Sequence, residues 1–256
     1  MSGEAWIAQG VPLLALWVRL AAFWWASPLA SATKAPVTVS VLFTGILAVS
    51  LGLSWQLPPQ RLGGAWPMAM IALMVMQEAM VGCLMGFALR AGVAAVSMAG
   101  HWIDMQAGLS MASMLDPAMR THTTPLAALG TLLGVLVFFQ MEGPEALVRA
   151  LAFSAEGMPP GQWALKLSLP QLIRPMLAMA SLTVVLAAPV LAVLLLIELF
   201  YAVLARVLPQ LNILIVGVAP KALLAWTALA LVMPWWMDPL RRGQLEVFRF
   251  WHEVLA

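Results

Sequence analysis

The sequence predicts an all-α, polytopic integral membrane protein built from about six hydrophobic, partly broken helical segments that form hairpins. Of its 256 residues, 63% are hydrophobic and only 9% are charged, whereas a soluble domain is about half apolar and a quarter charged. The mean hydropathy is +0.94. Several charge-free runs also reach the roughly 20 residues that a helix needs to cross a bilayer. A water-soluble globule is therefore excluded.

Six apolar segments follow one another along the chain, at 11–32, 35–60, 66–99, 121–141, 175–197 and 207–237. The second, fourth and fifth segments contain no Asp, Glu, Lys or Arg, and each is long enough to span a membrane as a helix. The other three contain ionisable residues inside their apolar runs, namely Arg19, Glu78, Arg90 and Lys221.

Prolines and small residues indicate that these segments pack on protein as well as on lipid. Proline lacks a backbone N–H and kinks or ends a helix, and in lipid the freed carbonyls need partners in neighbouring helices or in a wet cavity. Such prolines are Pro28, Pro189, Pro220 and Pro234. Small residues in the third segment let another backbone approach closely, either in a second subunit or in this chain's own hairpins: Gly82, Gly86, Ala88 and Gly92.

Charge and composition exclude several classes of function. The chain has 13 Lys and Arg against 11 Asp and Glu, a net charge of +2, which provides no basic surface for nucleic acid. The single cysteine, Cys83, excludes a disulfide scaffold or a multi-thiolate metal site. His101 and Asp104 are three residues apart, but zinc needs three or four converging ligands, and no phosphate loop or nucleophile elbow is present. No metal, cofactor or enzymatic activity is predicted.

Ionisable residues inside or beside the apolar runs need an explanation, because placing an unpaired charge at membrane depth costs several kcal/mol of free energy. One interpretation is a proton or ion relay. The other is a set of ion pairs that fix helices or subunits in register, with long arginine side chains that can also snorkel to the interface. The residues concerned are Arg19, Glu78, Arg90, Asp104, Glu198, Arg206 and Lys221.

The stretch 101–125 differs from its apolar surroundings. It contains two of the three histidines, two aspartates, four methionines and many small residues. Asp116 followed by Pro117 predicts a turn or a helix stop. Irregular polar backbone between apolar segments requires protein or water around it. The stretch is therefore either a re-entrant loop that lines a pore or a connector outside the membrane.

Three stretches carry a family resemblance: LWVRLAAFWWASPL at 16–29, EAMVGCLMGFALRAGVAAVSMAGHWIDMQAGLSMASMLDP at 78–117, and APVLAVLLLIELFYAVLARVLPQLNILIVGVAPKALL at 188–224. The specific combination is Gln106-Ala-Gly-Leu before Asp116-Pro117, then Arg206 before Pro209-Gln210-Leu-Asn212, then Pro220-Lys221. In this order the motifs resemble the FliR/SctT family of flagellar and injectisome export proteins.

The resemblance implies a core subunit of the type III protein export gate, in the bacterial inner membrane, at a flagellar basal body or an injectisome base. Its implied partners are FliP/SctR-like and FliQ/SctS-like membrane subunits, an FlhB/SctU-like protein, membrane lipid and unfolded export substrates. Residues 1–120 correspond to a FliP-like part that ends in a plug loop, and residues 121–256 to a FliQ-like part with a helical hairpin. All belong to one membrane-embedded domain.

By the same resemblance, residues 108–117 match the loop that plugs the channel. Its residues are Gly108, Met111, Met114, Leu115, Asp116 and Pro117, with methionine where family members often have phenylalanine. Methionine is flexible and soft, so it can seal an irregular opening and repack, although ordinary packing beneath a turn is the alternative. Subunit contacts or buried charges are expected at Arg19, Glu78, Arg90, Asp104, Gln106, Glu198, Arg206, Gln210, Asn212 and Lys221.

Two alternatives to flagellar export stay open. The loop sequence GLSMASMLDP leans toward flagellar members, but a virulence injectisome subunit of the same family is the first alternative. The second is a small-solute transporter, which would have an inverted repeat. Only a loose similarity between ASPLA at 26–30 and AAPVLA at 187–192 is visible.

Overall fold

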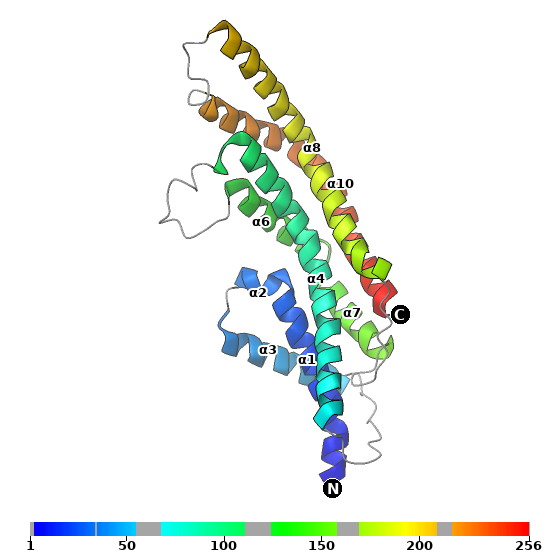
Figure 1. Cartoon of the computed structure of the whole chain (residues 1–256). Helices are drawn as coiled ribbons and strands as arrows, with labels where there is room; N and C mark the ends of the chain where they lie inside the picture. Colours follow the sequence, from blue (N-terminus) through cyan, green and yellow to red (C-terminus); the bar gives the residue numbers. More distant parts are fainter. Residues whose placement is uncertain are drawn as a thin grey trace. The chain divides into compact units, whose positions relative to one another are not determined.

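A computed structural model describes residues 3–33, 35–54, 68–110, 124–157, 169–208 and 217–255. All regular secondary structure in these ranges is helical, which confirms the all-α prediction. The helices, labelled in Figure 1, are α1 (Gly3–Ala26), α2 (Pro28–Thr33), α3 (Val37–Ser54), α4 (Met68–Ala107), α6 (Pro125–Gln140), α7 (Gly143–Gly157), α8 (Leu169–Val207) and α10 (Val218–Leu255).

Each of the six predicted segments contributes to a helix, but three helices are longer than predicted. α4 continues to Ala107, α8 extends from Leu169 to Val207, and α10 continues to Leu255. The added part of α10 is amphipathic, since Leu240, Val247 and Trp251 recur at helical spacing and are buried. Sequence hydropathy missed this part because its exposed face is charged.

Among the described residues, four helices are long and apolar enough to cross a membrane: Val37–Ser54, Met68–Ala107, Ile173–Val207 and Val218–Glu253. Pro125–Gln140 and Gly143–Ala155 form a fifth candidate if this pair, bent by 68°, is counted as one span. The shorter apolar helix Gly10–Ala26 falls below the length of a span. The chain is therefore a polytopic membrane protein, and its described residues contain four or five candidate crossings.

The predicted break at Pro28 is observed, and a second bend, which the sequence did not predict, separates α6 from α7. At Pro28 the missing N–H ends α1, and Ser27 caps the break by donating its hydroxyl to the carbonyl oxygen of Trp24 at 2.8 Å. Between α6 and α7 the chain bends at Glu142, whose φ is 56°. α8 continues through Pro189, and α10 through Pro234, so these two prolines do not end their helices.

The helices gather into two compact units, each made of segments far apart in sequence. The first unit comprises Met1–Ala91, Gly143–Pro175 and Val247–Ala256, and the second comprises Gly92–Glu142 and Met176–Glu246. In the first unit, α1 packs against α2 and α3. The end of α10 is attached to α4 by Trp251, whose buried indole N–H donates to the carbonyl oxygen of Met85 at 3.1 Å.

The second unit has one continuous apolar core between α4, α6, α8 and α10. Ile103, Leu186, Leu194 and Leu229 are among its buried residues. α8 is also joined to α4 by the buried hydroxyl of Thr183, which donates to the carbonyl oxygen of Ala95 at 3.1 Å. Because both hydrogen bonding and apolar burial connect these helices, the second unit provides a firm base for the segment that leaves α4 after Ala107.

Two glycines of α4 let it lie directly against α1 in the first unit. A Cβ on Gly86 would lie 2.7 Å from the Cβ of Ala26 and 2.7 Å from the carbonyl oxygen of Phe23. A Cβ on Gly82 would collide with the carbonyl oxygen of Arg19. At these two positions the small residues pack this chain's own helices, which was one of the two interpretations of the sequence.

Replacing Gly86 by leucine should therefore separate α1 from α4. We expect a lower midpoint of thermal unfolding, followed by circular dichroism in detergent, equivalent to roughly 1–3 kcal/mol of overpacking. Gly10→Leu is the matched control, because a Cβ at Gly10 meets no atom within 4 Å and leucine favours helix more than glycine does. An equal midpoint for both variants would contradict the close approach.

Candidate functional site

A buried ion pair joins three segments of the first unit. The Arg19 Nε–H of α1 donates to a Glu78 carboxylate oxygen of α4 at 2.6 Å, and both side chains are 1% exposed. Arg19 Nη1 also donates to the carbonyl oxygen of Ser154 in α7 at 3.0 Å. Charges this deep in an apolar unit stay there because they are paired and hydrogen-bonded.

Arg90 has a different role from the buried pair. Its guanidinium Nη2 donates to the carbonyl oxygens of Ser27 at 3.1 Å and Trp25 at 3.4 Å, at the break between α1 and α2. The last carbonyls of a helix have no partner within that helix, and a cation at this end also interacts favourably with the helix dipole. Arg90 thus satisfies the end of α1 from the neighbouring α4.

In the second unit, Asp104 of α4 holds the start of α6. Its carboxylate accepts hydrogen bonds from the backbone N–H groups of Leu126 at 2.9 Å and Ala127 at 3.1 Å, and the side chain is fully buried. These N–H groups lie in the first turn of α6, where they lack partners within the helix. Thr124, in the N-cap position, makes no capping hydrogen bond with its own side chain, so the distant aspartate provides the cap.

A second polar cluster lies near the end of α4. Glu198 of α8 accepts one hydrogen bond from the Gln106 amide at 2.7 Å and forms an ion pair with Lys221 of α10 at 2.5 Å. Lys221 is 15% exposed and Glu198 is 42% exposed. One carboxylate therefore connects three helices, and each of its oxygens accepts a separate donor.

The two polar clusters stand at the two ends of the predicted plug loop. On one side, Gly108 leaves α4 with φ of 80°, a conformation that glycine adopts without steric cost, and the Leu109 N–H donates to the carbonyl oxygen of Asp104 at 3.0 Å. On the other side, α6 begins at Pro125. Residues Met111, Met114, Leu115, Asp116 and Pro117 lie outside the described residues.

The structure thus brings together two sets of predicted residues, Arg19 with Glu78, and Gln106 with Glu198 and Lys221. Arg90 and Asp104 bind backbone groups, while Arg206 is exposed in the last turn of α8. Gln210 and Asn212 lie outside the described residues. Ser154 was missed, because a lone serine in an amphipathic helix gives no sequence signal.

The polar side chains described above link helices to one another, and their arrangement does not resemble a catalytic site. Within the described ranges, no three His, Cys, Asp or Glu side chains gather to hold a metal ion. His101 Nδ1 lies 3.5 Å from the Thr124 hydroxyl beside the start of α6. The arrangement therefore consists of anchors on both sides of one connecting segment.

Fold and contacts together define a polytopic helical membrane protein with an anchored polar connection between α4 and α6. Residues 11–245 match the family described as Bacterial export proteins, family 1. The chain belongs to this family. As a member it is an export protein and not an enzyme.

The comparisons confirm that the chain is a member of the predicted FliR/SctT family. Its named relatives include both flagellar proteins and proteins of the other branch of the family. The Salmonella typhimurium surface presentation of antigens protein SpaR is 32% identical over 69% of this chain and 66% of its own length. The Bacillus subtilis flagellar biosynthetic protein FliR is 25% identical over 86% of this chain and 85% of its own length. The Yersinia pestis Yop proteins translocation protein T is 27% identical over 69% of each chain.

The alignments with the SpaR proteins of Salmonella typhimurium and Shigella flexneri cover 66% and 59% of those relatives, which is less than two thirds of their length. The Bacillus subtilis FliR alignment is the most extensive of those described here. The shared region includes the polar clusters at both ends of the predicted loop, since the family match extends over residues 11–245.

Removing one partner of the buried ion pair should strongly destabilise the first unit. Glu78→Ala leaves the Arg19 charge without its carboxylate, and such a loss costs roughly 3–5 kcal/mol. We expect a large fall in the thermal unfolding midpoint, and partial recovery in the double variant Arg19→Met with Glu78→Met. Glu145→Ala is the control, since its pair with Arg149 is exposed and contributes little. Similar midpoints for Glu78→Ala and Glu145→Ala would overturn this view.

Proposed function

We propose that the chain is a core subunit of a type III protein export gate, in which residues 108–117 close a channel for unfolded substrates. The single observation that carries this proposal is the anchoring of both ends of the loop on one unit. Asp104 holds the start of α6, while Gln106 binds Glu198 beside the exit from α4. A gate segment needs fixed ends if its middle is to move without displacing the helices around it.

The charges of the anchors suit this role. Lys221 neutralises Glu198 within a largely apolar unit, and the Asp104 carboxylate meets the positive end of the α6 dipole. Each of these printed side-chain contacts joins residues of helices outside the loop 108–117. The loop sequence can therefore serve sealing, and the methionines at 111 and 114 supply flexible apolar side chains that repack at small cost.

Deleting residues 108–117 from the assembled complex should raise ion conductance across the membrane, because the proposed seal would be missing. The measurement is single-channel current in planar bilayers, together with ion leakage from cells. Deletion of the equally long segment 159–168, between α7 and α8, is the matched control. Unchanged conductance in an intact complex would remove the loop from the gating role.

A milder variant separates sealing from anchoring. Glu198→Gln keeps the size of the side chain but removes the ion pair with Lys221, so the loop end should be held less firmly. Brief openings are expected in place of a permanent leak. Glu145→Gln, which alters an exposed pair on α7, should leave the current at its resting value.

The proposed setting is a complex in the bacterial inner membrane with FliP/SctR-like, FliQ/SctS-like and FlhB/SctU-like partners. Support comes from the family of export proteins and from broad apolar faces, with Ile46 and Leu53 of α3 both at least 70% exposed. Such faces need lipid or other subunits to cover them. The correspondence of residues 1–120 to a FliP-like part and of 121–256 to a FliQ-like part is included in this proposal.

We propose that the chain takes part in flagellar assembly, because its loop sequence GLSMASMLDP resembles that of flagellar members of the family. An injectisome is the second candidate, because the chain is 32% identical to SpaR. Removing the chain from its bacterium should abolish swimming and external flagellar filaments, while secretion of needle-type substrates continues. Re-expression of the chain should restore motility. Normal motility with loss of needle-type secretion would instead assign the chain to an injectisome.

A further inference from the structure

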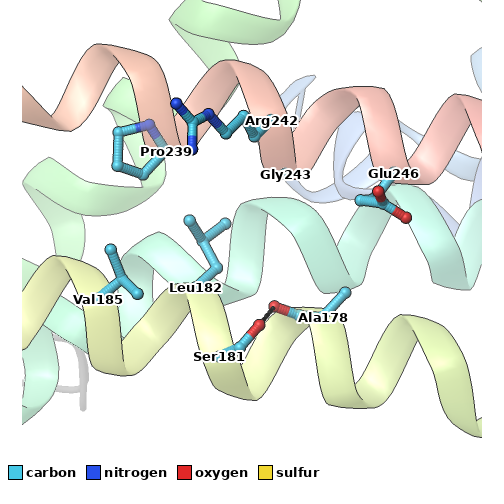
Figure 2. Close-up of a pocket in the computed structure, with 8 residues that line it drawn as sticks. All are labelled: Ala178, Ser181, Leu182, Val185, Pro239, Arg242, Gly243 and Glu246. Carbon is cyan, nitrogen blue, oxygen red and sulfur yellow. Dashed lines mark hydrogen bonds between the residues drawn. The ribbon is translucent and has the colours of Figure 1, made fainter.

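A narrow groove separates α8 from α10 within the second unit, and Figure 2 shows its lining. Its volume is about 250 Å³. Four lining residues come from each helix: Ala178, Ser181, Leu182 and Val185 from α8, and Pro239, Arg242, Gly243 and Glu246 from α10. Gly243 keeps the two helices close at this point, since a Cβ there would lie 2.6 Å from a methyl carbon of Leu182.

The groove has an apolar end with a guanidinium beside it. Figure 2 shows Val185 across from Pro239 at one end, the Arg242 side chain directed toward Pro239, and Glu246 further along α10. The apolar end leads toward the part of α10 where Leu229 and Ala228 contribute to the core. A ligand that matches this groove must therefore combine a hydrocarbon portion with a polar group at one end.

The order of residues along α10 gives the depth of the groove in a membrane. The apolar run of α10 ends at Met237, shortly after Trp235, and the charged residues Asp238, Arg241 and Arg242 follow it. Tryptophan concentrates at the membrane–water interface, and Trp235 is 81% exposed. Arg242 follows seven residues later, about 10 Å along the axis on the same face. With Trp235 at the membrane–water interface, this distance corresponds to the level of lipid headgroups.

Arg242 is also available to a ligand. It is exposed, and no described residue forms an ion pair or hydrogen bond with it. Glu246, one turn further along α10, already has an interaction within the chain. A guanidinium forms strong, often paired hydrogen bonds with phosphate oxygens. The guanidinium of Arg242 therefore suits a phosphate group.

We propose that this groove binds one phospholipid molecule. The phosphate accepts hydrogen bonds from Arg242, and an acyl chain lies along Leu182 and Val185 toward the level of Trp235. A free phosphate ion would bind Arg242 but leave the apolar end uncovered. The bound lipid would hold α8 and α10 at a fixed depth, a role that goes beyond the export function proposed above and does not depend on it.

Native mass spectrometry of the full chain in detergent, titrated with phosphatidylglycerol, tests the phosphate contact. Arg242→Gln removes a charged hydrogen bond to the phosphate, so its affinity for the lipid should be roughly tenfold lower or weaker still. Arg241→Gln is the matched control, because Arg241 is also exposed but is not among the residues that line the groove. Excess inorganic phosphate should not displace the lipid. Equal binding by the two variants, or displacement by phosphate, would overturn the proposal.

A second pair of variants tests the hydrocarbon contact. Val185→Trp should fill the apolar end and lower lipid binding, whereas Val184→Trp should not, since Val184 is similarly exposed at 51% but lies outside the lining. A photo-crosslinking side chain at position 185 should give a lipid adduct in the assembled complex. Crosslinking to a protein subunit at this position, without a lipid adduct, would show that a partner occupies the groove and would refute lipid binding.

Discussion

The ion pair between Arg19 and Glu78 illustrates the constraint on which the rest of the structure depends. A polar group inside an apolar helix must find its partner within protein, because neither lipid nor an apolar core can hydrate it. Arg19 meets this requirement with a carboxylate of α4 and the backbone of α7. The second unit meets it in the same way, where Glu198 accepts from Gln106 and pairs with Lys221. Each charge therefore selects which helices can be neighbours.

Backbone groups at helix ends impose the same requirement, and side chains from other helices satisfy them. Arg90 binds the carbonyl groups left at the break before Pro28, and Asp104 caps the first turn of α6. In both cases the long helix α4 supplies the side chain. Together with Gln106, these contacts make α4 the element that organises both units and both ends of the predicted plug loop.

Several features of the fold and the site could be predicted because they depend on local sequence. The apolar segments, the break at Pro28 and the unusual ionisable residues follow from composition and spacing, and the order of short motifs gave the export family that the comparison confirms. Helix ends were less predictable. The C-terminal part of α10 is a helix because Leu240, Val247 and Trp251 are buried on one face, a pattern that a search for uniformly apolar runs overlooks.

The sequence by itself determined the class of protein, the family and the identity of the charges that require partners. Only the tertiary structure decided which partner each charge has. Arg19 and Glu78 are 59 residues apart, and Gln106 and Glu198 are 92 apart, so no local pattern links them. The periodicity of a helix specifies which residues share a face, but it carries no information about which helix that face will meet. That choice follows from the close contacts allowed by glycines such as Gly86 and from the free energy of burying each charge with a partner.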